Sequence, residues 1–331
     1  VVSSLTNGTT YNFLVRAAGA GYGANSSSVS VIPGLIWDVY ASNYNAGTGV
    51  WTDSSANANN VTATGTVPTK GTYPDSVAFG GATVFSHPTT YNASTDAVKS
   101  SIGAWFKTTS AGKIVGFGDT NGWDHHMYVG SDGYLHAGLY TTSIYAVVSN
   151  STVNDGVWRY AVATFDGTTV KLYINGVLQT STSTGTGSLQ SYTGSWKIGG
   201  TTLTNWPSAP TSGYFTGSIG HAFAYHRALS AAETSAMYSA ELAPYTPLAI
   251  TFANGGGTGT QASASALPNN VYVLPASALS KPGYTFAGWN DGSNTYAVGA
   301  SYTMPSSGPV TFTAQWTSNL ILDYDATDTN S

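Results

Sequence analysis

Residues 155–178 carry the pattern that most constrains how this chain can fold. They read DGVWRYAVATFDGTTVKLYINGVL, and side chains of two kinds alternate from Trp158 to Phe165 and again from Val170 to Ile174. A period of two is typical of β-strands whose two faces meet different surroundings. Asp166-Gly167 and Asn175-Gly176 are turn signals, because these residue types tolerate positive φ angles. Since a hairpin cannot bury its own apolar face, we expect a larger sheet around it.

The composition indicates an all-β chain and excludes several classes of function. Only 8% of the 331 residues are charged, against a usual ~25%, and helical periodicity is confined to residues 229–241. The ten Lys and Arg residues are scattered, so no basic patch predicts nucleic-acid binding. No apolar run has the length of a membrane span. Because cysteine is absent, disulfides and thiol chemistry are excluded, which favours a bacterial or archaeal exterior over an animal one.

The 155–178 motif and a later one together resemble laminin-G-like domains of the concanavalin-A-like lectin/glucanase type. The later motif consists of YFTGSI at 214–219 and YHRALSAAE at 225–233, which match the closing strand and short helix of that family. The resemblance extends from Gly34 to Leu242. It implies that residues 34–243 form an antiparallel jelly-roll sandwich of two sheets, the concanavalin-like fold.

The flanking segments resemble other modules of large bacterial surface proteins. Residues 1–33 resemble the last strands of a fibronectin type III domain, with Tyr11 as its corner tyrosine. Residues 244–317 contain the run GYTFAGW and resemble the Listeria–Bacteroides repeat, a small β-grasp-like module whose aromatic residues we expect in its core. Residues 318–331 are similar to the first strand of the laminin-G-like region and predict another such domain. We therefore expect a segment of a longer modular protein.

Carboxylates decide whether a sandwich of this type is a hydrolase. Glycoside hydrolysis needs two carboxylates that face one groove. Glu233 and Glu241 are the only glutamates of the chain, and both fall on a helix predicted at 230–240, where Ser230 and Glu233 have the spacing of a capping box. We therefore expect no enzymatic activity.

One polar loop contains the best candidate metal site. Asp119, Asn121 and Asp124 offer the oxygen ligands that Ca²⁺ prefers, and the resembled family often binds calcium at a sandwich rim. The alternative is a hairpin loop whose Asp and Asn side chains cap turns. This alternative is favoured, because Ca²⁺ takes about 6–8 oxygens and the loop offers few carboxylates. His125 and His126 would point to opposite faces of a strand, which argues against a shared transition metal.

Three aromatic residues are candidate platforms for a sugar ring. Trp123 and Trp206 lie in predicted loops, and Tyr140 is near them in the sequence. An aromatic side chain in a loop presents an apolar face for stacking. The alternative for Trp206, which precedes Pro207, is that it closes the edge of the sandwich, and the sequence does not decide between the two.

These observations predict a non-enzymatic segment of a secreted or cell-surface protein, bacterial in origin. Its laminin-G-like sandwich is expected to bind a glycan or a surface protein in adhesion or recognition, with calcium as the one candidate cofactor. A different class of function stays open: a subunit of an extracellular fibre, sheath or phage tail appendage, in which copies of the chain pair their end strands. A glycoside hydrolase is the disfavoured third hypothesis.

Overall fold

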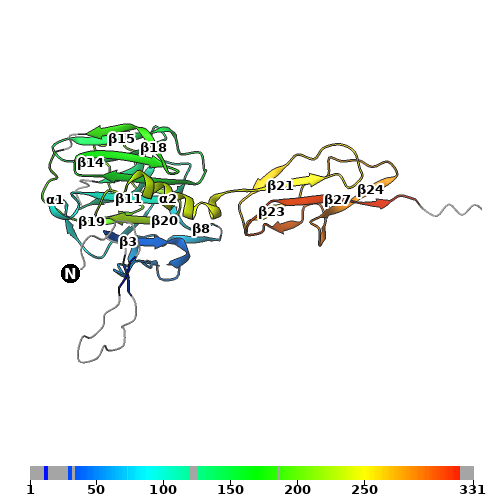
Figure 1. Ribbon diagram of the computed structural model, residues 1–331, viewed down its shortest axis with the longest axis horizontal. Helices are drawn as coiled ribbons and strands as arrows, with labels where there is room; N and C mark the ends of the chain where they lie inside the picture. Colours follow the sequence, from blue (N-terminus) through cyan, green and yellow to red (C-terminus); the bar gives the residue numbers. More distant parts are fainter. Residues whose placement is uncertain are drawn as a thin grey trace, which may run out of the picture. The chain divides into compact units, whose positions relative to one another are not determined.

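The chain is nearly all β and divides into two compact units, Val1–Ala240 and Glu241–Ser331 (Figure 1). The computed structural model describes residues 11–13, 29–31, 34–72, 74–119, 125–184 and 187–320. Near the N-terminus, β1 (Tyr11–Phe13) pairs antiparallel with β2 (Val29–Val31). The rest of 1–33 and, of the segment 318–331 predicted to begin another domain, residues 321–331 lie outside the described residues. The fibronectin resemblance, with the role assigned to Tyr11, and the further laminin-G-like domain therefore stay predictions.

Two antiparallel sheets form the sandwich of the first unit. The strands of the ten-stranded sheet are β4 (Tyr44–Asn45), β5 (Val50–Trp51), β6 (Val61–Gly65), β9 (Thr83–Ser86), β10 (Tyr91–Asn92), β12 (Gly112–Gly118), β13 (His126–Val129), β14 (Tyr134–Tyr140), β15 (Ile144–Thr152) and β19 (Thr193–Ile198). Their order is β15-β14-β13-β12-β19-β9-β6-β5-β4, and β10 also pairs with β19.

The strands of the eight-stranded sheet are β3 (Leu35–Tyr40), β7 (Thr69–Thr72), β8 (Asp75–Gly80), β11 (Ser100–Lys107), β16 (Arg159–Phe165), β17 (Thr169–Ile174), β18 (Val177–Thr184) and β20 (Thr216–Tyr225). Their order is β18-β17-β16-β11-β20-β8-β7, and β3 also pairs with β20. Two short helices, η1 (Ala41–Asn43) and α1 (Ala93–Asp96), lie in the connections. The predicted all-β fold with an antiparallel sandwich is confirmed.

The core of the sandwich follows from the alternation of side chains along the strands. Val115 and Phe117 of β12 and Trp196 of β19 share one buried cluster with Ala163 and Phe165 of β16. The intervening residues of β12 and β19 therefore point to the opposite, outer face of the ten-stranded sheet. That outer face carries the candidate site described below.

The hairpin region predicted at 155–178 is confirmed. Strand β16 pairs with β17, and β17 pairs with β18. Asn175 and Gly176 have φ angles of 51° and 76°, as a type I′ turn requires. Helix α2 (Ala231–Glu241) covers the outer face of the eight-stranded sheet. The Tyr238 ring lies 5.7 Å from that of Trp105 and 6.1 Å from that of Tyr160. Figure 1 shows α2 beside β11 and β20.

The start of α2 is a capping box, as predicted. The backbone N–H of Ser230 donates to Glu233 Oε2 at 2.8 Å, and the N–H of Glu233 donates to Ser230 Oγ at 3.2 Å. Glu233 also forms an ion pair with Arg227 at 2.8 Å. Its carboxylate therefore stabilises the helix and its connection to β20. The helix is followed by η2 (Ala243–Tyr245), and within the described residues no helix is long and apolar enough to cross a membrane.

The second unit is a small mixed β-structure. Its strands are β21 (Leu248–Ala253), β22 (Ala264–Ala266), β24 (Tyr284–Asn290), β25 (Thr295–Tyr296) and β27 (Val310–Ser318), in the order β22-β21-β27-β24-β25, with β23 (Val271–Val273) paired to β26 (Ser301–Thr303). Trp289 and Phe312 are fully buried in its core, and Trp289 Nε1 donates to the Pro275 carbonyl at 2.8 Å. These two aromatic residues are core, as predicted.

Candidate ligand-binding groove

The connection from β19 to β20, residues 199–215, folds back over the outer face of the ten-stranded sheet; we call it the cover loop. Glycines let its two ends approach each other closely. The Phe215 N–H donates to the Gly199 carbonyl and the Lys113 N–H donates to the Gly213 carbonyl, at 2.9 and 3.0 Å. A Cβ atom on Gly213 would clash with the Thr201 carbonyl oxygen. The cover loop is thus a closed surface loop of the kind that often carries function.

Three non-glycine residues of the cover loop have left-handed backbone conformations. The φ angles of Thr201, Asn205 and Ser208 are 96°, 67° and 47°. Such conformations cost free energy and persist only where the surrounding structure holds them. Their concentration in one loop makes it a candidate functional element.

Apolar packing holds the middle of the cover loop against the sheet. Leu203 and Trp206 form a buried cluster with Tyr128 of β13, and Tyr140 of β14 packs against this cluster half-buried. The Trp206 ring lies 4.6 Å from that of His126. The structure therefore brings two predicted platforms, Trp206 and Tyr140, together, but as packing partners. Of the two roles that the sequence leaves open for Trp206, the structure shows the buried one: the side chain is 5% exposed and packs between the cover loop and the sheet.

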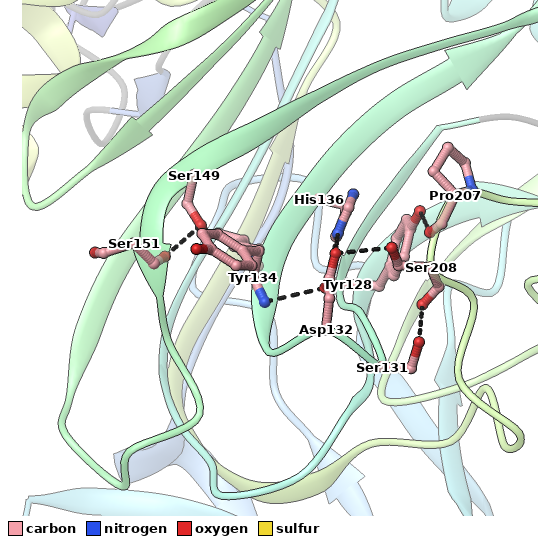
Figure 2. Close-up of polar contacts among 10 residues, drawn as sticks. Tyr128, Ser131, Asp132, Tyr134, His136, Ser149, Ser151, Pro207 and Ser208 are labelled. Atoms are coloured by element: carbon pink, nitrogen blue, oxygen red, sulfur yellow. Dashed lines mark hydrogen bonds and ion pairs between the residues drawn. The ribbon is translucent and has the colours of Figure 1, made fainter.

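A polar network holds the cover loop at residues 207 and 208 (Figure 2). Tyr128 donates its hydroxyl proton to the Pro207 carbonyl at 2.6 Å. Asp132 Oδ2 accepts from Ser208 Oγ at 2.7 Å and lies 3.0 Å from His136 Nε2. The Tyr128 and His136 rings stack at 5.2 Å. Partial burial acts to raise the pKa of Asp132, but the hydrogen bonds from Ser208 and His136 hold it below its ordinary value.

Asp132, His136 and Ser208 have the composition of a hydrolytic triad but not its connectivity. A triad needs the serine hydroxyl bonded to the imidazole, which accepts its proton. Here both Ser208 and His136 bond to the same carboxylate, Asp132. This arrangement anchors the cover loop and does not activate a nucleophile.

A groove of about 590 Å³ opens between the cover loop and the ends of β12 and β19. Its walls are rich in hydroxyl groups, and its one aromatic ring is Tyr214, which is 40% exposed. The charged side chains along it are Lys197 and Asp119; the Lys197 Nζ donates to the Asp119 carbonyl at 3.3 Å. The lining consists of Asp119, Lys197, Thr201, Thr202, Leu203, Thr204, Ala209, Pro210, Thr211, Ser212, Gly213 and Tyr214.

The predicted calcium ligands are placed only in part. Asp119 lines the groove, whereas Asn121 and Asp124 lie outside the described residues, as does the predicted platform Trp123. The Lys197 Nζ donates to the Asp119 backbone carbonyl, and an ammonium this close to Asp119 disfavours a second cation there. Among the residues that the structure describes, no three His, Asp or Glu side chains gather as metal ligands would. Calcium binding stays a prediction.

Sequence reasoning missed the residues that shape the groove. Lys113, Lys197, Thr201 and Tyr214 were not among the candidates. Lys113 had a detectable signal, because it is the one charged residue in the otherwise apolar strand GKIVGFG. The others had none, since their proximity depends on the pairing of β12 with β19 and on the path of the cover loop.

Comparisons with solved structures find similar structures at low sequence identity. Domain 4 of AbnA, an extracellular arabinanase from Geobacillus stearothermophilus solved with arabinotriose, is 18% identical with a TM-score of 0.43; the match covers 62% of this chain and 98% of that one. The binding domain of botulinum neurotoxin serotype D is 15% identical with a TM-score of 0.47, over 66% of this chain and 56% of that one. The binding domain of Paraclostridial mosquitocidal protein 1 is 13% identical with a TM-score of 0.48, over 68% and 59%.

These likenesses concern the fold alone, and the chain spans little more than half of the two toxin domains. No curated protein sequence matches the chain. Two family models do match it, and they agree with the resemblances of the two motifs in its sequence. Residues 79–235 thus belong to the concanavalin A-like lectin/glucanase superfamily, and residues 249–315 form a Listeria-Bacteroides repeat domain.

Proposed function

We propose that the first unit is a recognition domain that binds a glycan in the groove under the cover loop. The observation that carries this proposal is the exposed Tyr214 ring at a groove of about 590 Å³, a volume typical of small-ligand sites. An aromatic ring can stack on the apolar face of a sugar. The threonine and serine hydroxyls around it can donate to and accept from the hydroxyl groups at the sugar's edge.

The loop that forms the groove is anchored rather than free. Buried Trp206 and Leu203 hold it from below, and Tyr128, Asp132 and Ser208 hold it at the side. A rigid site loses less conformational entropy when a ligand binds. The anchoring therefore supports a preformed binding site.

The proposed role is binding without catalysis. Among the described residues that line the groove, Asp119 is the one carboxylate, whereas glycoside hydrolysis uses two. The Glu233 carboxylate accepts from the Ser230 N–H at the start of α2 and forms an ion pair with Arg227. We place the domain in a modular protein of a bacterial surface, where its ligand is a glycan or a glycosylated surface protein.

No described feature favours the alternative of a fibre subunit. That hypothesis depends on end segments that pair with another copy, and those segments lie almost entirely outside the described residues. The one pair that is described, β1 with β2, forms within the chain.

A glycan array with the intact chain tests the proposal. We expect binding to one or more glycans, and we expect Tyr214→Ala to weaken it about tenfold, the loss of about 1.4 kcal/mol. Tyr284→Ala is the matched control, because Tyr284 is 41% exposed but lies in the second unit. Absence of binding to every glycan, or equal losses in the two variants, would contradict the proposal.

A further inference from the structure

Lys113 is a buried lysine without a counter-charge among its hydrogen-bond partners. Its side chain is 1% exposed, and its Nζ donates to the Thr201 hydroxyl and, at 3.0 Å, to the Thr202 carbonyl. Both acceptors are neutral. Lysine is almost never fully buried unless it is paired, and a buried ammonium without a partner ion is costly. The fold therefore retains Lys113 at this position against a free-energy cost.

A second lysine lies next to it at the groove. Lys197 of β19 is half-buried and lines the groove wall. Burial and, secondarily, the charge of Lys197 hold the pKa of Lys113 well below its ordinary value. Burial likewise lowers the pKa of Lys197, although Asp119 opposes this shift. An anion bound at Lys197 in the groove would therefore stabilise a positive charge on the neighbouring, buried Lys113.

Thr201 connects the buried lysine to the groove. Its hydroxyl oxygen accepts from Lys113 Nζ, and the residue itself lines the groove. A threonine hydroxyl has one proton to donate. Because its oxygen is occupied by Lys113, this proton is available to an acceptor on the groove side. The left-handed backbone of Thr201, with φ 96°, is the strain that accompanies this placement.

We propose that the groove selects an acidic glycan, whose carboxylate or sulfate group binds at Lys197 and the Thr201 hydroxyl, and that Lys113 takes up one proton from solvent when this anion binds. The inference rests on the proposed function of the same groove. The anion supplies the negative charge that is missing among the partners of Lys113, and protonated Lys113 then donates to Thr201 as an ammonium. Charge-assisted hydrogen bonds of this kind are stronger than neutral ones.

Other titratable groups lie near Lys113 and Lys197 and can influence this proton uptake. Tyr128 lies opposite Lys113 on β13, and His126 lies opposite Gly116, across which the Lys113 side chain runs. Asp119 and Tyr214 line the groove. Of these, Asp119 is the one negative charge, and it competes with the ligand for Lys197.

Isothermal titration calorimetry on the intact chain provides the test. The probes are three oligosaccharides of equal length: a neutral one, one with uronic acid residues and one with sulfate esters. We expect at least one acidic probe to bind about tenfold more tightly than the neutral one and to bind more weakly as salt is raised. We also expect the measured heat to vary with the ionisation enthalpy of the buffer, in the sense of proton uptake. The uronate and sulfate probes distinguish the two sources of the anion.

Three variants separate the preference for an acidic ligand from the uptake of a proton. Lys197→Gln should lose the preference for the acidic probe, Lys113→Met should abolish the proton uptake, and Lys99→Gln, an exposed lysine elsewhere in the unit, should change neither. If Lys113→Met does not fold, Lys197→Gln still decides the preference and the wild-type buffer series decides the proton uptake. Equal affinity for neutral and acidic probes with no proton uptake would overturn this inference and leave glycan binding intact. If no probe of any class binds and the glycan array is also blank, both proposals are wrong.

Discussion

The side chain of Gln179 accepts a hydrogen bond from the backbone N–H of Asn150 at 2.9 Å and so joins the two sheets at their open edges. Asn150 is on β15 and Gln179 on β18, the edge strands of the two sheets. In return, Asn150 Oδ1 accepts from the backbone N–H and the hydroxyl of Thr180, at 3.0 and 2.6 Å. Side-chain amides thus satisfy backbone groups that an edge strand otherwise leaves open to a foreign strand.

Removing this contact should destabilise the first unit moderately. We expect Gln179→Ala to lower the free energy of unfolding by about 1 kcal/mol, because the hydrogen bonds of the amide with the Asn150 N–H and the Val177 carbonyl are both lost while water can reach the freed backbone groups. Urea titration followed by tryptophan fluorescence measures this. Thr182→Ala, an exposed change on the same strand, should leave the midpoint in place, and an equal shift in both variants would contradict the role of the amide.

The hydroxyl of Tyr128 should stabilise the position of the cover loop more than it stabilises the sheet. Tyr128→Phe keeps the buried ring but leaves the Pro207 carbonyl without its 2.6 Å donor. We expect a loss of about 1 kcal/mol in stability and faster proteolysis within residues 201–213. Tyr173→Phe removes a buried hydroxyl from the opposite sheet. It should leave proteolysis of the loop unchanged; unchanged proteolysis in Tyr128→Phe would show that the apolar cluster alone holds the loop.

A side chain at Gly213 should disrupt the closure of the cover loop. A Cβ atom there clashes with the Thr201 carbonyl oxygen, which is backbone and cannot rotate away. We expect Gly213→Ala to cost about 2–4 kcal/mol, measured as a shift of the urea midpoint. Gly80→Ala is the matched control, because a Cβ at Gly80 meets no atom within 4 Å. A midpoint for Gly213→Ala equal to that of the control would mean that the loop ends are not held at this separation.

Stability should fall in mild acid because of one buried histidine. His125 lies among aromatic rings, with Phe165 at 5.9 Å and Trp196 at 6.0 Å, and burial lowers its pKa from 6.5 to about 4. The folded state therefore binds fewer protons than the unfolded state between these values. The contribution of neutral His125 to the free energy of unfolding is complete above pH 6.5. It declines as the pH falls toward about 4, and below that pH the protein has lost about 3 kcal/mol of stability.

Unfolding titrations from pH 7.5 to 4 check this expectation. His125→Phe removes the titrating group and keeps an aromatic ring, so its stability should decline less steeply than that of the wild type between pH 6.5 and 4. Carboxylates also titrate in this range, as do His87 and His226, whose pKa values burial lowers too; the comparison of the two proteins isolates His125. Parallel curves would contradict the prediction.

The sequence predicted those parts of the structure that local patterns determine. The Asn175-Gly176 turn and the box at Ser230 and Glu233 depend on residues a few positions apart, and both were predicted correctly. The sequence does not decide the role of Trp206, because its burial depends on Tyr128, which contacts the same loop from a strand about 80 positions earlier. Lys113 was overlooked because its neighbours Thr201 and Thr202 are brought to it only by the cover loop.

The anchors of the cover loop leave exposed positions on both sides of Trp206 open to substitution. The base of the loop is held by Gly199 and Gly213 and its middle by Trp206, whereas Thr204, Thr211 and Ser212 face solvent. Evolution or an engineer can exchange these exposed positions without refolding the sandwich. Under the proposed glycan binding, the cover loop is therefore suited to diversification, because one anchored backbone can present different side chains to the groove.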